Sequence, residues 1–293
     1  MDIDSHTRPV AVLGFPVEHT LSPLIHNTAF REQRLNFVYL ASAVRPADVE
    51  AAVHGLRVLG FAGANVTIPH KQAVLPLMDE VSEQARAVGA VNTIVCRQGQ
   101  VDVDVVKLYG DNTDVAGFLE PLRPHADALR EKPMLVFGAG GAAHAVAYAM
   151  LTAYRPERLF IVARRQEKAI RLADHLRGFD EARALTIPAQ RAVREAVRES
   201  RLVVNATPLG MYPDVEASPW PDLDDFTPDQ VVYDLIYNPV QTKLLRGAAA
   251  RGAITIGGLD MLIAQAACSY VQWTGHEMPV DFVRAKLAGH FGK

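Results

Sequence analysis

The sequence predicts an α/β protein with two domains, one of them built on a doubly wound parallel sheet. Short apolar segments alternate with longer helical ones along most of the chain, which is typical of a parallel sheet covered by helices on both faces. One apolar strand, 134–137, leads directly into a glycine-rich turn and a long helix. The length of 293 residues also corresponds to about two domains of ordinary size.

The composition and charge narrow the class of protein. Hydrophobic residues make up 49% of the chain and charged residues 22%, as in globular proteins. The net charge of −3 gives no electrostatic reason to bind nucleic acid or an anionic membrane. No segment approaches the roughly 20 apolar residues of a membrane span. We therefore expect neither a nucleic acid nor a membrane as partner.

Cysteine and histidine placement bears on location and on metal binding. Residues 1–9 contain two Asp and no apolar run, so we expect no signal peptide. Cys96 and Cys268 lie far apart and form no CxxC pair, which suits a reducing cytoplasm. The histidines form no HExxH motif and no Cys/His cluster, so we expect no metal.

The first half of the chain supplies the elements of one predicted domain. The expected strands are 9–15, 37–43, 60–66, 93–97 and 101–109, and the expected helices are 46–59, 79–88 and one that begins at Ser22. Ser22 followed by Pro23 indicates a hydroxyl N-cap and a proline at the first helical position. Thr20 and Ser22 either only cap this helix or bind a carboxylate at its N-terminus. The segment by itself favours capping.

The segment 63–71 is the most suggestive stretch of this half. It is predicted to be a strand end that runs into a helix started by Pro69, with Lys71 held at the turn. A partly shielded amine at a sheet edge can take part in proton transfer, whereas most single lysines are only solvated. Asp114 lies where the next strand end feeds a helix. It either complements the helix dipole or pairs with Lys71.

The second half carries a nucleotide-binding signature. Strand 134–137 is followed by Gly138, Gly140 and Ala143 in the positions of the dinucleotide fingerprint. The next strand, 159–163, ends without an acid: Ala163 is followed by Arg164, Arg165 and Gln166, with Lys168 one step further on. Guanidinium groups favour a 2′-phosphate, so the pattern predicts NADP rather than NAD. The alternative is that these residues form a solvated helix start.

Further apolar strands and helices complete the predicted sheet. The expected strands are 183–187, 202–206, 231–235 and 253–256, and the expected helices are 189–199, 240–251, 258–273 and 279–288. Segments 205–210 and 234–239 follow two of these strands, where a doubly wound sheet presents loops to its cofactor. Gln265 lies in an apolar helix and needs a partner if buried, for which a hydroxyl-rich substrate is one candidate.

The ordered series of motifs resembles the shikimate dehydrogenase family over essentially the whole chain. The series consists of segments 14–27, 65–71, 89–93, 112–117, 138–143, 205–210 and 258–265. Each motif is unspecific by itself, whereas their order is specific. The resemblance implies an α/β substrate domain, a Rossmann-like NADP domain and C-terminal helices that return to the first domain. The implied borders are 1–118, completed by 257–293, for the substrate domain and 119–256 for the dinucleotide-binding domain.

The resemblance also implies an activity and its residues. The activity is the reversible, NADPH-dependent reduction of 3-dehydroshikimate to shikimate, in the biosynthesis of chorismate and aromatic amino acids. Lys71 and Asp114 would be the catalytic pair. The residues implied to bind substrate are Thr20, Ser22, Thr67, Lys71, Asn92, Asp114, Tyr237 and Gln265. Those implied to bind cofactor are Gly138, Ala139, Gly140, Gly141, Ala142, Arg164, Arg165, Lys168, Leu235 and Gly258.

Two departures from the family pattern keep alternatives open. Thr20 stands where Ser is usual, so preference for shikimate over quinate is an open question. Ala163 replaces the usual Asn beside Arg164, and an Arg-Arg pair also occurs in NAD-using quinate/shikimate relatives. A quinate/shikimate dehydrogenase with relaxed cofactor use is therefore the nearest alternative. A non-catalytic NADP-binding regulator is a remote one. The sequence does not decide the oligomeric state, and a homodimer is one outcome.

Overall fold

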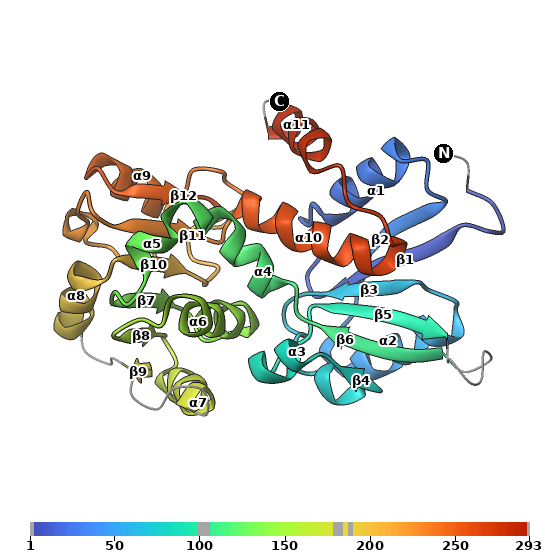
Figure 1. The fold of residues 1–293 in the computed structure, drawn as a ribbon, viewed down its shortest axis with the longest axis horizontal. Helices are drawn as coiled ribbons and strands as arrows, with labels where there is room; N and C mark the ends of the chain where they lie inside the picture. The colour runs from blue at the N-terminus through green and yellow to red at the C-terminus, as the bar shows by residue number, and fades with distance from the viewer. Residues whose placement is uncertain (1–2, 99–105, 178–183, 187–189, 292–293) are drawn as a thin grey trace. The chain divides into compact units, whose positions relative to one another are not determined.

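The computed structural model describes residues 3–98, 106–177, 184–186 and 190–291 (Figure 1). The chain forms two compact units. The first consists of Met1–Thr113 with Ile263–Lys293, and the second of Asp114–Leu262. In Figure 1 the first unit is coloured blue to cyan with its C-terminal helices in red, and the second runs from green to orange. Each unit is organised around one six-stranded sheet, which confirms the predicted α/β class.

The sheet of the first unit is mixed and has the strand order β2-β1-β3-β5-β6-β4. Its strands are β1 (Arg8–Gly14), β2 (Phe37–Ala43), β3 (Gly63–Val66), β4 (Glu80–Val81), β5 (Thr93–Gln98) and β6 (Val106–Asp111). The helices are α1 (Ser22–Glu32), η1 (Pro46–Asp48), α2 (Val49–Val58), η2 (Leu75–Leu77), α3 (Glu83–Val88), α10 (Gly258–Thr274), which begins in the second unit, and α11 (Val280–Phe291). Strand β5 runs antiparallel to both β3 and β6, whereas β1 runs parallel to β2 and β3.

Side chains on the two faces of the first sheet pack into two different clusters. Ala11 and Leu13 of β1 pack with Val53 and Leu56 of α2 on one face. Aromatic side chains gather in a second cluster: Phe30, Phe37, Tyr39, Tyr270 and Trp273, together with His26. The period of two along a strand explains this division, because neighbouring residues point to opposite faces.

Two predicted helices of the first unit are wrong. Residues 68–74 form consecutive turns that end in η2, rather than a helix started by Pro69. A second proline, Pro76, follows in η2, and a proline in a helix interior has no N–H to donate and clashes with the preceding turn. The predicted helix 79–88 is shorter, because β4 pairs with β6 and Ser82 then caps α3 by accepting a hydrogen bond from Ala85 N at 3.0 Å.

The sheet of the second unit is entirely parallel, in the order β12-β11-β10-β7-β8-β9. Its strands are β7 (Met134–Phe137), β8 (Leu159–Val162), β9 (Ala184–Thr186), β10 (Leu202–Asn205), β11 (Val231–Asp234) and β12 (Ile254–Ile256). The helices are α4 (Asp114–Leu119), η3 (Glu120–His125), α5 (Ala126–Leu129), α6 (Gly141–Tyr154), α7 (Gln166–Arg177), α8 (Gln190–Glu199), η4 (Leu223–Asp225) and α9 (Lys243–Ala250). The alternation confirms the predicted doubly wound sheet. Of the predicted strands, 101–105, 183 and 187 lie outside the described residues.

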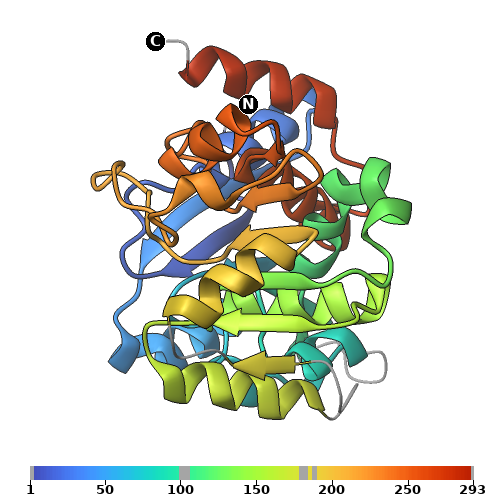
Figure 2. The same cartoon turned by 90° about the vertical axis from the view of Figure 1, so that its left-hand side faces the viewer.

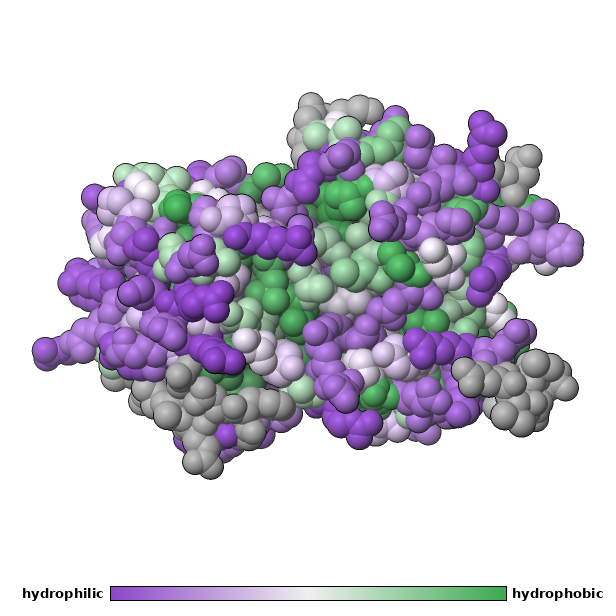
Figure 3. Space-filling view, in the orientation of Figure 1, coloured by the Kyte–Doolittle hydropathy of each residue, from purple (hydrophilic) through white to green (hydrophobic). Residues whose placement is uncertain are grey.

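Helices α8 and α9 cover one face of the parallel sheet. Val193 and Val197 of α8 and Leu244 of α9 pack with Leu135 and Val203 from the strands. Figure 2 looks onto this unit from the α8 side and shows that helix crossing in front of the sheet. The opposite surface of α8 is hydrophilic, as the purple colour at the left of Figure 3 shows. The two faces of α8 thus separate core from solvent, as expected for an amphipathic helix.

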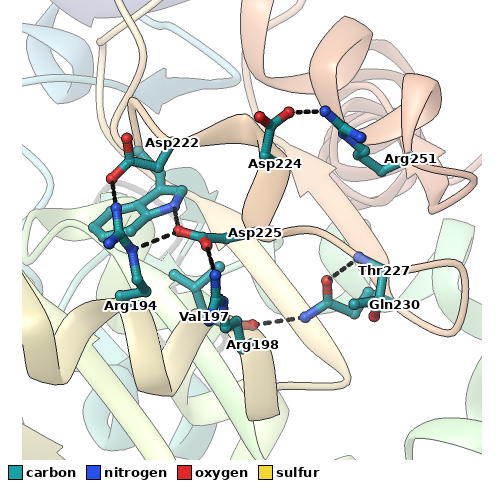
Figure 4. Close-up of polar contacts among 10 residues, drawn as sticks. Arg194, Val197, Arg198, Asp222, Asp224, Asp225, Thr227, Gln230 and Arg251 are labelled. Atoms are coloured by element: carbon teal, nitrogen blue, oxygen red, sulfur yellow. Dashed lines mark hydrogen bonds and ion pairs between the residues drawn. The ribbon is translucent and has the colours of Figure 1, made fainter.

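A cluster of ion pairs connects α8 to the segment that carries η4 (Figure 4). Asp225 is 4% exposed, and it accepts hydrogen bonds from Arg194 Nε at 3.1 Å, Arg198 Nε at 2.9 Å and Trp220 Nε1 at 3.1 Å. Asp222 binds Arg194 as well. A buried carboxylate with this many donors remains satisfied without water. The buried carboxylate of Asp225 thus joins α8 to the segment of η4, while the side chains of Arg194 and Arg198 remain exposed.

Candidate active site

The turn that carries Lys71 is fixed at the carboxyl end of β3. Thr67 N donates to Leu13 O at 2.9 Å, and Val91 N donates to Lys71 O at 2.8 Å. The imidazole of His70, which is 1% exposed, lies 2.7 Å from Val44 O through Nε2. These contacts hold the main chain of Lys71 beside the segment that enters β5. The Lys71 side chain itself is half-buried.

Asn92 connects this turn to the residue that precedes Asp114. Asn92 is 2% exposed, and its Oδ1 accepts a hydrogen bond from Thr113 N at 2.8 Å while its Nδ2 donates to Thr113 Oγ1 at 3.0 Å. Asn92 is also one residue from Val91, which binds the main chain of Lys71. The segments that carry Lys71, Asn92 and Thr113 therefore meet at one hydrogen-bonded junction within the first unit.

Behind this junction lies a buried polar network that sequence reasoning missed. Tyr39 Oη donates to Asn65 Oδ1 at 2.7 Å, and Asn65 Nδ2 donates to Ser269 Oγ at 3.0 Å. Thr93 Oγ1 lies 2.8 Å from Ser269 Oγ and donates to Asn92 Oδ1 at 2.9 Å. The available signal was Asn65 in an otherwise apolar strand, because a buried amide requires polar partners.

The hydroxyls of Thr20 and Ser22 are neighbours, but Ser22 does not cap α1. The N-cap position is Leu21, no side chain caps the helix within the described residues, and Ser22 is already helical. The two hydroxyls instead lie 3.2 Å apart, and Thr20 Oγ1 accepts a hydrogen bond from Ser22 N at 3.3 Å. The prediction that Ser22 is the N-cap was therefore wrong, whereas the Thr20 hydroxyl does bind the first N–H of the helix. The pair presents two hydroxyl groups at the N-terminus of α1, where a carboxylate is favoured.

The remaining predicted site residues are divided between the units. Thr67 and Gln265 belong to the first unit, and both are half-buried. Gln265 O accepts a hydrogen bond from Ser269 Oγ at 3.1 Å, which links it to the buried polar network. Asp114, 4% exposed, opens the second unit at the start of α4. Tyr237 also lies in the second unit, where burial raises the pKa of its phenol above the usual value.

The predicted glycine turn forms the N-terminus of α6. Gly138 has φ +118°, and a Cβ there would lie 2.8 Å from Ala206 O, so glycine is required at this position. Gly140 is the N-cap, and within the described residues no side chain caps the helix. A Cβ on Gly140 would have no atom within 4 Å apart from those of its chain neighbours. Ala139, Gly141 and Ala142 complete the turn. A long helix N-terminus with open space before it suits an anion such as a pyrophosphate.

Cationic side chains lie at the end of the neighbouring strand β8. Arg164 and Arg165 are exposed in the turn before α7, and Lys168 is half-buried in its first turn. Gly258 lies elsewhere in the unit at the start of α10, where Gly258 N donates to Ile236 O at 3.1 Å. A Cβ on Gly258 would lie 2.1 Å from Leu235 O, so the segment after β11 approaches this helix as closely as backbone allows.

The described part of the chain has neither a metal site nor a membrane-spanning helix, and it has a cavity away from the predicted site residues. Across residues 3–98, 106–177, 184–186 and 190–291, no group of three His, Cys, Asp or Glu side chains is arranged to hold a metal. Within these same residues, no helix has both the length and the apolar character needed to span a bilayer. A cavity of about 590 Å³ lies between α1 and α11, lined in part by Thr28, Arg31 and Phe282. Its lining includes none of the predicted site residues.

Comparison with known proteins identifies matching families for both ends of the chain. Residues 12–94 match the model of the shikimate dehydrogenase substrate binding domain, and residues 258–288 match that of the shikimate 5′-dehydrogenase C-terminal domain. A shikimate dehydrogenase (NADP(+)) from Salinibacter ruber is 59% identical over 95% of this chain and 96% of its own length.

Solved structures show the same architecture. Shikimate 5-dehydrogenase from Thermus thermophilus, in complex with NADP(H) and shikimate, has a TM-score of 0.82 and 35% identity, covering 96% of this chain and 99% of that one. Quinate dehydrogenase from Corynebacterium glutamicum, in complex with NAD, has a TM-score of 0.85 and 32% identity, covering 97% of this chain and 99% of that one. By fold, motif order and sequence identity over nearly its full length, the chain belongs to the shikimate dehydrogenase family.

Proposed function

We propose that this chain is an oxidoreductase that interconverts 3-dehydroshikimate and shikimate with NADPH. The observation that carries the proposal is the hydrogen-bonded junction at which Asn92 joins the segment of Lys71 to Thr113, the neighbour of Asp114. Such a reduction needs a proton donor at the reacting oxygen, which an amine oriented by a carboxylate can supply. The identity of 59% to an NADP-dependent shikimate dehydrogenase supports both substrate and cofactor.

The residues of the second unit fit NADP. The N-terminus of α6 offers N–H groups to a pyrophosphate, and the open space at Gly140 admits it. Ala139, Gly141 and Ala142 complete that turn. Exposed guanidinium groups at Arg164 and Arg165, with Lys168 beside them, suit a 2′-phosphate. Leu235 and Gly258 would line the nicotinamide side.

When bound, the nicotinamide supplies the hydride, and the protein contributes alignment and proton transfer. Reduction of a ketone leaves negative charge on its oxygen, so Lys71 would deliver a proton to that oxygen and Asp114 would orient the ammonium. The hydroxyls of Thr20 and Ser22 would bind the substrate carboxylate, with Tyr237 beside it. The side chains of Thr67, Asn92 and Gln265 would hydrogen-bond the ring hydroxyls.

The proposal extends to domains, assembly and location. Residues 1–118 with 257–293 would form the substrate-binding domain, and residues 119–256 the NADP-binding domain. We place the protein in the cytoplasm, because its two cysteines lie far apart and form no CxxC pair, which suits a reducing compartment. A homodimer is the assembly to test, by light scattering of the purified protein across a concentration series.

A four-way assay tests the function. Initial rates are measured with shikimate and with quinate, each with NADP and with NAD. We expect the highest kcat/KM for shikimate with NADP, because two guanidiniums lie at the cofactor end of β8. A higher kcat/KM for quinate with NAD would contradict the proposal and favour a quinate dehydrogenase. Cofactor binding without turnover of either acid would favour a regulator.

The variant Thr20→Ser sharpens the substrate question. It keeps the hydroxyl and removes only the methyl, which would lie near the ring carbon that carries the extra hydroxyl of quinate. We expect its ratio of shikimate to quinate activity to fall relative to the wild type. An unchanged ratio would show that Thr20 does not determine this preference.

A further inference from the structure

A buried carboxylate joins two loops at the carboxyl edge of the parallel sheet. Asp234 is the last residue of β11 and is 0% exposed. It accepts three hydrogen bonds from three different elements: Asn205 Nδ2 of β10 at 3.0 Å, Ile236 N of the following loop at 3.1 Å, and Thr242 Oγ1 before α9 at 2.7 Å. Among the described residues no cation pairs with it. One side chain thus organises three segments.

Asn205 extends this arrangement into the neighbouring loop. Its Oδ1 accepts hydrogen bonds from Thr207 N at 3.0 Å and Thr207 Oγ1 at 2.7 Å, and its Nδ2 donates to Leu209 O at 3.1 Å as well as to Asp234. The main chain adds a bond from Leu235 N to Asn205 O at 3.0 Å. The loops after β10 and β11 therefore form one hydrogen-bonded body.

The segment 235–237 is held from two sides. Asp234 accepts from Ile236 N, and Ile236 O accepts from Gly258 N at 3.1 Å. The close approach of Gly258 to Leu235 O prevents displacement in that direction. Both hydrogen-bonding groups of the Ile236 main chain are thus engaged. Such a segment presents Leu235 and Tyr237 in one fixed orientation.

We propose that Asp234 is a positioning residue that, through Asn205 and Thr242, holds residues 235–237 in the geometry needed for hydride transfer. The inference rests on the proposed function, in which Leu235 lines the nicotinamide and Tyr237 lies beside the substrate. Because Asp234 is 0% exposed, it would contact neither the nicotinamide nor the substrate and would act only through the loop. Misplacement of a reacting group by about 1 Å can lower the rate by on the order of a hundredfold. Loosening this loop should therefore lower kcat more than it weakens cofactor binding, most of which the α6 turn and the arginines would supply.

Thr242 offers the sharper test, because a matched pair of variants separates its hydroxyl from its shape. Thr242→Val removes the donor to Asp234 and keeps the volume, whereas Thr242→Ser keeps the hydroxyl, which also accepts from Leu245 N as the N-cap of α9. We expect Thr242→Val to lower kcat by about tenfold and to change the Kd for NADPH by less than about threefold. Thr242→Ser should keep both values near those of the wild type.

Asp234→Ala and Asp234→Asn form a second pair. Asn retains an acceptor for Asn205 Nδ2 and Ile236 N, so it should restore most of the kcat that Ala loses. The primary isotope effect with NADPH deuterated at the transferred position should rise in the slow variants. A purely structural role predicts lower Tm and fewer active molecules, with wild-type kcat per NADPH-binding site and a wild-type isotope effect. That result would overturn the inference.

Hydrogen exchange of the amides of residues 235–237 separates the inference from the proposed function. We expect faster exchange of these amides in Thr242→Val than in Thr242→Ser, whether or not any substrate is turned over. If the wild type reduces no shikimate-type acid, the proposed function fails. If exchange and kcat per binding site are both unchanged in Thr242→Val, the inference fails while the proposed function stands.

Discussion

The two sheets bury polar groups in contrasting ways. In the first unit the buried polar groups behind the Lys71 turn are neutral, as in the network of Tyr39, Asn65 and Ser269. In the second unit a single carboxylate, Asp234, is buried at the sheet edge among three donors. Neutral polar groups can satisfy one another through many weak hydrogen bonds that point in different directions. A buried anion instead requires several donors aimed at one place, which fixes the loops that supply them.

A buried histidine sharpens this contrast. His26 is 0% exposed, and within the described residues neither ring nitrogen has a hydrogen-bond partner. Its ring stacks on Tyr39 with centroids 4.4 Å apart. Burial lowers the pKa of His26 to about 3, whereas burial raises the pKa of Asp234 to about 6. The first unit thus buries a neutral base and the second buries an acid, so their stabilities should respond to pH in opposite directions.

The largest expected effect comes from the amine of the first unit. Lys71→Ala should retain NADPH binding, because the proposed cofactor residues lie in the second unit, and should lower kcat by on the order of 10²–10⁴-fold. The measurements are kcat from initial rates and the Kd for NADPH. Lys107→Ala is the control: it removes an exposed amine that forms an ion pair with Glu80 at the surface. A near-normal kcat for Lys71→Ala would refute the catalytic role.

The second unit should show the opposite division between binding and turnover. Gly140→Ala introduces a methyl where no atom beyond the chain neighbours lies within 4 Å, so Tm should be unchanged, but the methyl would enter the space proposed for the pyrophosphate. We expect the Kd for NADPH to rise by about tenfold, equivalent to about 1.4 kcal/mol. Gly289→Ala is matched, since its Cβ position is equally open and lies in the first unit. Equal NADPH affinity in both variants would argue against the pyrophosphate site.

The acid sensitivity of the first unit should depend on His26. The unfolded chain takes up a proton near pH 6.5, whereas the folded state takes it up only near pH 3. The stabilisation is therefore complete above pH 6.5 and is lost as pH falls toward 3, at up to about 1.4 kcal/mol per pH unit. His26→Phe should flatten this dependence in urea unfolding measured between about pH 4 and about pH 7. A slope equal to that of the wild type would show that His26 is not its source.

Asp234 should produce the reverse slope in the second unit. Its pKa is raised from 3.8 to about 6, so the folded state is favoured by protonation and loses stability as pH rises from 3.8 to about 6. Asp234→Asn cannot ionise and should remove this loss. Hydrogen exchange of β10 and β11 amides, followed across this range, reports on the second unit separately. If the variant retains the same pH dependence in these strands, the assignment to Asp234 is wrong.

The smallest effects should come from the ion pairs around η4. Arg251→Ala removes a partner of Asp224, which is 82% exposed, and should change the free energy of unfolding by less than about 0.5 kcal/mol. Arg198→Ala removes the same charge but leaves Asp225, which is 4% exposed, with fewer donors. We expect a loss of about 1–2 kcal/mol there. Equal losses in urea unfolding would show that burial of the acceptor does not matter.

Regular elements with a clear pattern could be predicted from sequence. The parallel sheet followed from apolar strands such as 134–137 and 202–206, which lie within a residue of β7 and β10. The helix expected at Pro69 and the early start expected for α3 were wrong, because local propensity did not reveal the proline-rich turn or the pairing of β4 with β6. Strand β4 has only two residues, and a pairing so short leaves no periodic signal.

Several candidate site residues could also be selected from the sequence, but for a different reason. Glycine turns and strand ends have local sequence requirements, so the amino-acid order marked Gly138, Lys71 and Asp114 as candidates. The catalytic pairing of Lys71 with Asp114 came from the family resemblance and stays a prediction. The capping role expected for Ser22 was wrong because the first helical residue is set by backbone angles. The sequence does not reveal whether these angles become helical at Ser22 or one residue later. Tyr39 and Ser269 escaped notice because their hydrogen-bond partner, Asn65, is far away in sequence.

The sequence by itself determined the class of sheet, the glycine turn and the order of motifs, because each depends on neighbours within a few residues. Only the tertiary structure decided which polar side chains are buried together: Asn92 with Thr113, Asn65 with Ser269, and Asp234 with Asn205 and Thr242. The physical reason is that burial makes an unpaired polar group costly, while the identity of its partner depends on segments that only the fold brings side by side.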